Sequence, residues 1–170
     1  MKTIRGLALI LNTDFITLLN IILYQPEIPP NTGNIIRLCA NTGARLHLVE
    51  PMGFTLDDAK LRRAGLDYHE WANVKRYESW ALFLEKNPDM TLWAFSTRAS
   101  KPYQNADFSP NDGLLFGPET RGLPIDILEQ VGAQALRIPM RPDSRSLNLS
   151  NTVAIVLYEA LRQTGFETLV

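Results

Sequence analysis

The sequence predicts an α/β domain in which helices sandwich a mostly parallel sheet. Short runs of β-branched, leucine and aromatic residues alternate along the chain with longer segments of helical character. Several of these apolar runs are followed at once by Gly, Pro, Ser and Asn, as is typical where a parallel sheet meets its ligand. At 170 residues and 45% hydrophobic composition, the chain can bury one good core, so we expect a single domain.

The first predicted elements are a buried strand and a capped helix. The run Asn20-Ile-Ile-Leu-Tyr24 is compact, β-branched and aromatic, which indicates a strand. Further along, Asn31 or Thr32 is suited to cap a helix that Gly43 ends. Between the two lie prolines that we expect to hold the chain extended, namely Pro26, Pro29 and Pro30.

The later elements follow the same alternation. The last predicted helix is amphipathic, with Val153, Val156, Leu157 and Leu161 on its inward face. In chain order we expect a strand over 46–49, a helix over 56–64, a strand over 71–77, a helix over 80–85, strands over 91–95, 114–116 and 135–138, and a helix over 149–163.

Charge and cysteine content restrict the function. The net charge of −1 argues against a protein that coats nucleic acid through bulk electrostatics, although it leaves room for a local basic face. Cys39 is the only cysteine, so no intrachain disulfide can form, and the cytosol is the natural compartment. We expect Cys39 to be a buried helix residue rather than a nucleophile. With only His47 and His69 beside it, no zinc or other metal site is predicted.

Three segments are rich in residues that make unusual backbone: 31–37, 115–124 and 138–150, here called the first, second and third segments. In the second, we expect Gly117 to let the backbone approach a ligand closely. The alternative is an ordinary loop between a strand and a helix. In the third, backbone groups can meet an adenine edge and hydroxyls a ribose or carboxylate, while Ser146 or Asn148 can cap the last helix.

Together the three segments resemble the three motifs of the SPOUT RNA methyltransferases. Within that superfamily, the phrases at 27–33, 51–54 and 61–70 are similar to the TrmL-type branch, which methylates the ribose 2′-oxygen of the tRNA wobble nucleotide. The resemblance implies a C-terminal trefoil knot and S-adenosylmethionine bound in a bent shape at a homodimer interface, with S-adenosylhomocysteine as product. It also implies the anticodon stem-loop of leucine tRNAs as substrate.

The resemblance begins only near Leu19, so we expect residues 1–18 to be an N-terminal extension and 19–170 a single methyltransferase domain. The apolar run in 1–18 ends at Asn12, is shorter than a secretory h-region and lacks a small-residue cleavage site. It is also too short to span a bilayer. Either Leu18 marks the true initiator, or the extension adds a short helix or strand.

The resemblance also implies residue roles. For chemistry it indicates Arg37, Ser146 and Asn148, with Arg37 as a bidentate clamp on phosphate, because a guanidinium stays protonated and is therefore a poor base. The substrate's phosphate or a water then removes the proton. The alternative for Arg37 is an exposed arginine or a salt bridge to Glu119. The cofactor contacts it implies are Phe95, where a smaller aliphatic residue is more usual, Gly117, Glu119, Ile138, Met140, Ser146 and Leu147.

RNA binding is expected on local basic surface. Lys60, Arg62 and Arg63 share one predicted helix, although a solvated helix face is the usual explanation for such a run. Two other functions stay open: ribosomal-RNA 2′-O-methylation in the same superfamily, and a non-catalytic RNA-binding knotted module. Around the third segment, the side chains suited to phosphate or to a stacked base are Arg141, Arg145 and Tyr158.

Overall fold

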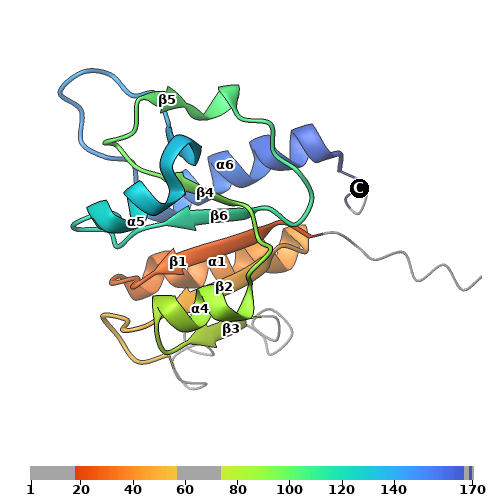
Figure 1. Ribbon diagram of the computed structural model, residues 1–170, viewed down its shortest axis with the longest axis vertical. Coiled ribbons are helices and arrows are strands. Elements are labelled where there is room, and N and C mark those ends of the chain that lie inside the picture. The colour runs from red at the N-terminus through yellow and green to blue at the C-terminus, as the bar shows by residue number, and fades with distance from the viewer. Residues whose placement is uncertain (1–17, 57–73, 167–168, 170) are drawn as a thin grey trace, which may run out of the picture.

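The computed structural model describes residues 18–56, 74–166 and 169, and within them it contains a seven-stranded sheet in the order β3-β2-β1-β6-β4-β7-β5 (Figure 1). Every pair of neighbouring strands runs parallel, which confirms the predicted α/β fold. The strands are β1 (Asn20–Tyr24), β2 (Arg45–Val49), β3 (Val74–Tyr77), β4 (Leu92–Phe95), β5 (Lys101–Pro102), β6 (Gly113–Phe116) and β7 (Ala135–Arg137).

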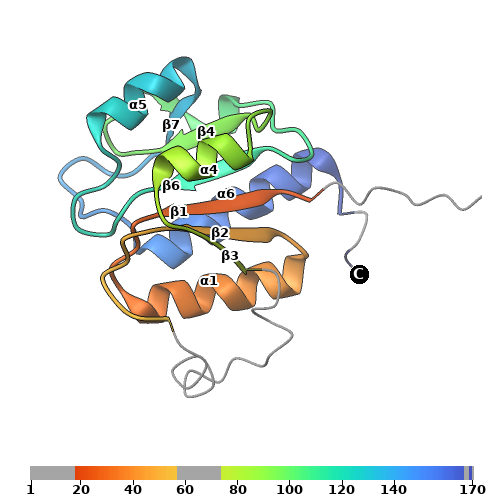
Figure 2. The same ribbon diagram turned by 60° about the horizontal axis from the view of Figure 1, so that its bottom comes forward.

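Helices cover both faces of the sheet. They are α1 (Pro29–Thr42), α4 (Trp80–Lys86), α5 (Ile125–Val131) and α6 (Leu149–Thr164), with 3-10 turns η1 (Tyr103–Asn105) and η2 (Gly132–Gln134). In Figure 1, α4 and α5 lie in front of the sheet, whereas α1 and α6 lie behind it; Figure 2 shows the same layers from another side. The described strands thus occupy the middle of a three-layer arrangement.

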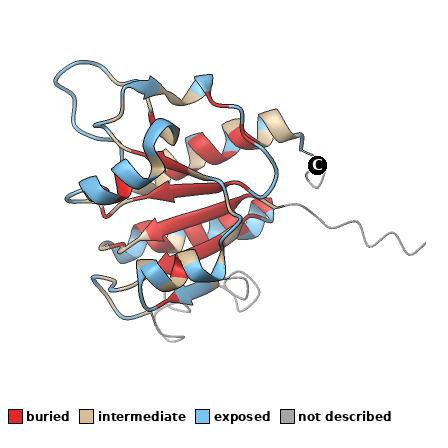
Figure 3. Cartoon of the chain, in the orientation of Figure 1, coloured by how far each residue is buried: buried red, intermediate tan, exposed pale blue. Residues whose placement is uncertain are grey.

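The alternation of side chains along each strand divides the core into two parts. In β1, Ile21 and Leu23 pack with the buried residues of α1 and α6, while Ile22 packs with those of α4 and α5. All three side chains are at most 1% exposed. Figure 3 shows this central strand buried along its length. Burial on both faces explains why β1 is a continuous apolar run.

The start of α1 corrects one prediction. Pro29 and Pro30 do not hold the chain extended but form the first turn of the helix, after Ile28 as N-cap. A proline fits there because the N–H that it lacks has no partner within the helix at that position. Asn31 lies inside the helix and makes no cap. The end is as predicted, since Gly43 adopts the left-handed conformation with φ of 75°.

The predictions for the later elements are confirmed only in part. The last helix buries Val153, Val156 and Leu157 as expected, but Ala160 is fully buried where Leu161 is only partly so. The short strand β5 was not predicted, because two residues carry no periodic signal. Except for Leu56, the predicted helix over 56–64 falls outside the described residues, as do residues 71–73 of the predicted third strand.

Cys39 is buried, and burial raises the pKa of its thiol to about 12, which agrees with the expected unreactive helix residue. Among the described residues, no helix is long and apolar enough to cross a membrane, and no group of three metal-binding side chains occurs. The trefoil knot and the division of the chain at residue 18 stay predictions.

Candidate active site at the carboxyl edge of the sheet

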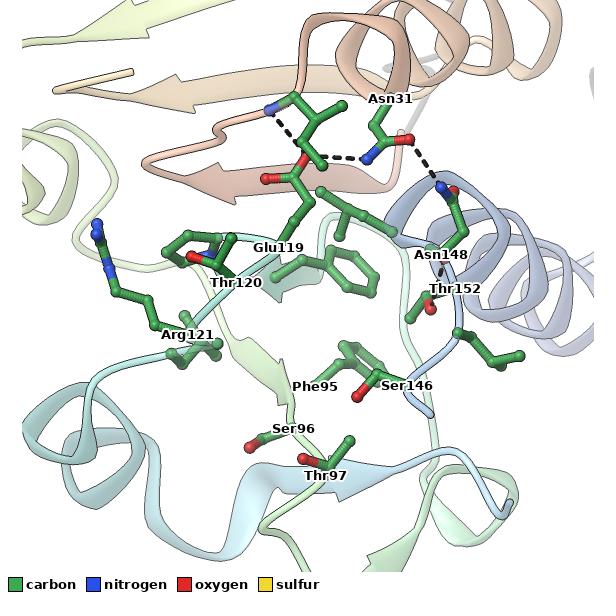
Figure 4. Close-up of a pocket in the computed structure, with 18 of the residues that line it drawn as sticks. Asn31, Phe95, Ser96, Thr97, Glu119, Thr120, Arg121, Ser146, Asn148 and Thr152 are labelled. Carbon is green, nitrogen blue, oxygen red and sulfur yellow. Dashed lines mark hydrogen bonds between the residues drawn. The ribbon is translucent and has the colours of Figure 1, made fainter. Parts of the chain in front are cut away.

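A cavity of about 430 Å³ opens at the carboxyl ends of β4 and β6, facing the loop that precedes α6 (Figure 4). A smaller cavity of about 80 Å³ adjoins it and shares part of its wall. The larger volume lies within the range of small-molecule sites in proteins. The predicted cofactor residues all line one or both cavities: Phe95, Gly117, Glu119, Ile138, Met140, Ser146 and Leu147.

The end of β4 forms a rigid part of the wall between the two cavities. The Phe95 ring is only 7% exposed and stacks on Phe116, with ring centroids 4.9 Å apart and planes 15° from parallel. The next residue, Ser96, donates its backbone N–H to the carbonyl of Leu136 at 3.0 Å. This hydrogen bond holds the end of β4 beside β7, so residues that follow both strands line the smaller cavity.

Glu119 ties the second segment to the first. Its carboxylate accepts the backbone N–H groups of Glu27 at 2.8 Å and Ile28 at 3.2 Å, and the side-chain amide of Asn31 at 3.0 Å. A carboxylate at this position satisfies the N–H groups of the two residues that precede α1 and complements the helix dipole of α1. The alternative of a salt bridge between Arg37 and Glu119 is not observed among the described residues.

Asn148 extends these contacts to the third segment. Its amide nitrogen donates to the side-chain oxygen of Asn31 at 2.9 Å, and its own oxygen accepts the backbone N–H of Ser150 at 2.9 Å. Asn148 is therefore the N-cap of α6, as the sequence allowed, and Ser146 is not. Figure 4 shows Glu119, Asn31 and Asn148 in one hydrogen-bonded chain, here called the edge network, which joins all three segments.

A second carboxylate closes the same junction from the other side. Glu27 accepts the backbone N–H of Thr120 at 3.0 Å and the Thr120 hydroxyl at 2.7 Å, and lies 3.4 Å from the Arg121 guanidinium. These hydrogen bonds to Thr120 hold the pKa of Glu27 below its usual value. The loops after β1 and β6 thus hold each other through one glutamate from each. Sequence reasoning missed Glu27, because no local pattern marks a partner so distant in the chain.

Gly117 lines the larger cavity, and the structure shows a second reason for a glycine there. A Cβ atom at Gly117 would lie 2.3 Å from the backbone nitrogen of Leu123 and 2.5 Å from the carbonyl carbon of Gly122. The close approach within the chain is therefore between the two arms of the second segment itself, while the approach of this backbone to a ligand stays a prediction. A side chain would have to displace the loop, since the opposing atoms are backbone and cannot rotate away.

The predicted catalytic and RNA-binding residues are only partly brought together. Ser146 and Asn148 line the larger cavity, whereas Arg37 is an exposed residue of α1 that is not among the cavity-lining residues described. Arg145 and Tyr158 are exposed near the third segment and on α6, respectively. Arg62 and Arg63 lie outside the described residues. Polar lining residues that sequence reasoning did not single out are Ser96, Thr97, Arg98, Thr120, Arg121 and Thr152.

A cavity at the carboxyl edge of a parallel sheet, lined by the start of α1 and by the loops after β4, β6 and β7, is typical of α/β domains that bind a nucleotide-type ligand. The chain belongs to the SpoU rRNA Methylase family, whose model matches residues 18–158. This membership confirms the resemblance to the SPOUT RNA methyltransferases.

Two curated relatives are similar to the chain over most of its length. The chain is 60% identical over 151 residues to the tRNA (cytidine(34)-2'-O)-methyltransferase of Burkholderia ambifaria, covering 87% of this chain and 97% of that protein. It is 58% identical over 150 residues to the enzyme of the same name from Escherichia coli K12, covering 88% and 96%.

Solved structures agree. A putative RNA methyltransferase from Bacillus anthracis superposes with a TM-score of 0.84 at 46% identity, covering 89% of this chain and 97% of that one. A structure described as giving insights into the 2-OH methylation of C/U34 on tRNA has a TM-score of 0.80 at 45% identity, covering 86% and 96%. The AdoMet-bound rRNA methyltransferase from Sinorhizobium meliloti has a TM-score of 0.75 at 28% identity, covering 85% of this chain and 56% of that one.

Proposed function

We propose that this chain is a cytoplasmic tRNA methyltransferase that moves a methyl group from S-adenosylmethionine to the ribose 2′-oxygen of the wobble nucleotide of leucine tRNAs. The observation that carries the proposal is the edge network, which gathers three sequence-distant segments around one cavity. The names of the 60% and 58% identical relatives supply the substrate and the position.

The cavities suit this cofactor in shape and chemistry. The smaller one is walled by Phe95, Ile138, Met140 and Leu147, apolar side chains that fit a flat purine. The larger one presents the polar ends of the second and third segments, which suit a ribose and an amino acid. Because Glu119 already accepts three hydrogen bonds, its part in cofactor binding is to position the loops rather than to hold the cofactor ammonium group.

When bound, the cofactor supplies an electrophilic methyl group on a sulfonium. Transfer to an oxygen requires in-line alignment, so the chain's own contribution is to position the hydroxyl. Ser146 and Asn148 line the larger cavity and are placed to orient it. Arg37 is exposed on α1, where it can meet RNA; we assign it the clamp on the phosphate beside the reacting ribose, which also stabilises the developing negative oxygen.

Arg37→Ala should therefore lower turnover by roughly 100- to 1,000-fold while leaving cofactor affinity near that of the wild type. Arg37→Lys should recover only part of the loss, because a point charge cannot replace a planar fork. Single-turnover methylation assays and calorimetry with the cofactor measure the two effects. Arg76→Ala is the matched control, since Arg76 on β3 pairs with Glu50, the residue that follows β2. Unchanged methylation by Arg37→Ala would rule out the assigned role.

We further propose a homodimer with cofactor sites at the interface. After α6 has packed its inner face, Ile155 remains 39% exposed and Tyr158 48% exposed on its outer face. Apolar surface of this kind on a long helix favours a partner. Light scattering should give twice the chain mass of 19.2 kDa, and Ile155→Glu should shift it toward monomer. A wild-type monomer at micromolar concentration would refute the dimer.

The decisive experiment uses two substrates that differ by one oxygen. Purified protein, labelled S-adenosylmethionine and a leucine tRNA should yield methylated nucleotide 34, mapped by mass spectrometry of nuclease fragments. The same tRNA with a 2′-deoxy nucleotide at 34 should take up no label. Label appearing instead in a ribosomal-RNA fragment would favour the alternative rRNA reaction. Cofactor binding without any transfer would favour a non-catalytic RNA-binding module.

A further inference from the structure

Arg37 has an interaction of its own, and the other arginines in the described part of the chain divide into two groups. Arg76, Arg121 and Arg162 each pair with a carboxylate, the last at 2.8 Å from Glu159. In a second group the guanidinium makes no ion pair or hydrogen bond within the described residues. This second group comprises Arg45, Arg98, Arg137, Arg141 and Arg145.

Four of these unpaired arginines lie around the two cavities. Arg98 lines the larger cavity and Arg137 the smaller one. Arg141 follows Met140 and Arg145 precedes Ser146, both of which line the smaller cavity. Arg45 differs, because it is the first residue of β2 and therefore lies at the opposite, amino edge of the parallel sheet.

Three elements contribute the four cations, and hydrogen bonds fix the backbone of these elements. The bond from Ser96 N–H to Leu136 carbonyl holds the β4 exit, which carries Arg98, against β7, which carries Arg137. Figure 4 shows that Ser96 and Thr97 lie across the cavity from Glu119 and Asn31. In the third segment, the Ser144 hydroxyl donates to the Arg141 carbonyl at 2.7 Å and folds the loop into a turn.

Nearby negative charge does not cancel this basic rim. Glu119 lines the larger cavity and Glu27 contacts Thr120 and Arg121, but hydrogen bonds from the neighbouring segments surround both carboxylates. The segment between β7 and α6 contains one acidic residue, Asp143, and two arginines, Arg141 and Arg145. A chain with a net charge of −1 thus concentrates unpaired positive charge around its cavities.

We infer that Arg98 and Arg137, together with Arg141 and Arg145, form a basic rim that binds successive phosphates of the RNA strand beside the reacting nucleotide. The inference rests on the proposed function and extends the predicted contact at Arg145 to β4 and β7. A single cofactor carboxylate cannot occupy four cations, and neither Arg141 nor Arg145 is among the lining residues described for the cavities. A phosphodiester chain can occupy all four.

The test measures binding of an anticodon stem-loop by fluorescence anisotropy at four salt concentrations, with S-adenosylmethionine affinity measured separately by calorimetry. Arg98→Ala and Arg137→Ala should each raise the RNA Kd by about three- to tenfold and lower the slope of log K against log salt by about one. Cofactor affinity should not change. Arg45→Ala removes the same charge at the opposite edge, and Arg76→Ala removes a paired one; both should bind RNA as the wild type does.

Unchanged RNA affinity and salt slope in the Arg98→Ala, Arg137→Ala double variant would overturn the rim. Loss of cofactor affinity with RNA binding intact would overturn it too, since it would assign Arg98 to the cofactor carboxylate. The proposed function fails separately: if the wild type binds and methylates a ribosomal-RNA fragment rather than tRNA, the rim still holds provided that the arginine variants lower the salt slope for that fragment.

Discussion

Two hydrogen-bond networks of the molecule differ in what surrounds them. At the carboxyl edge of the sheet, the edge network joins the start of α1 to two loops at the rim of an open cavity. In the interior, His47 of β2 is 1% exposed, contacts the Tyr77 hydroxyl at 2.9 Å through Nδ1, and contacts Asn20 at 3.1 Å through Nε2. The Asn20 amide continues to the Asn111 carbonyl at 2.9 Å.

Because the two networks differ in burial, we expect variants of the two to differ in their effects on stability and activity. Glu119 is half-buried at the rim of the open cavity, so water can replace a partner that it loses, and a broken bond there costs little stability but frees a loop that shapes the cavity. Inside the protein, the remaining partner bears its full desolvation cost. Edge variants should therefore impair activity more than folding, and variants of the His47 network should do the reverse.

The largest effect should come from Gly117→Ala, which tests how rigid the edge is. The added Cβ meets backbone at 2.3 Å, so the second segment must move. We expect the cofactor Kd to rise by roughly 100-fold, on the order of 3 kcal/mol, together with a lower melting temperature. Gly122→Ala is the matched control in the same loop: its φ is 68° but no atom lies within 4 Å, so only backbone strain of about 1 kcal/mol is added. Equal cofactor affinity in both variants would contradict this account.

The His47 network should be sensitive to pH. Burial, followed by the charges of Lys75 and Arg45, lowers the pKa of His47 to about 4. As pH falls below about 6.5, the unfolded chain takes up a proton that the native protein refuses. The free energy of unfolding should therefore fall between pH 6.5 and about 4, by on the order of 3 kcal/mol, and this contribution should level off below that range.

Urea unfolding at pH 7, 6 and 5 measures how steeply the free energy of unfolding depends on pH. His47→Gln should be less stable at pH 7 but should show a flatter profile between pH 6.5 and 4.5. The carboxylate of Glu159 affects stability at lower pH. Hydrogen bonds from Arg162 and Gln163 lower its pKa to about 2, so its contribution to the free energy of unfolding is lost only as pH falls from about 4.5 toward 2. A His47→Gln profile as steep as that of the wild type would show that another group titrates.

The smallest change in stability should follow Glu119→Gln, at about 1–2 kcal/mol, because one carbonyl replaces a carboxylate with three donors. Turnover should nevertheless fall by roughly tenfold, since Asn31 and Asn148 lose their anchor. Asp126→Asn, on the neighbouring helix α5, is the control of equal charge change. If Glu119→Gln lost stability but kept its turnover, the proposed contrast between the edge network and the buried His47 network would be wrong.

The sequence alone determined the α/β class and most element positions and, through the family resemblance, the predicted cofactor residues that line the cavities. The strand over 20–24 and the stop at Gly43 were predictable because each depends on residues that are neighbours in the chain. The three segments were recognisable for the same reason: glycine, proline and asparagine mark unusual backbone wherever they gather.

Only the tertiary structure decided which distant residues those segments contact. Pro29 and Pro30 became a helix start, with Glu119, about ninety positions away, accepting the N–H of Ile28. The need for glycine at 117 comes from Leu123, across a turn of the same loop, and Glu27 meets Thr120 only after the sheet has formed. Local patterns report backbone preference, whereas a hydrogen bond between distant loops depends on where folding places their atoms, to within tenths of an ångström.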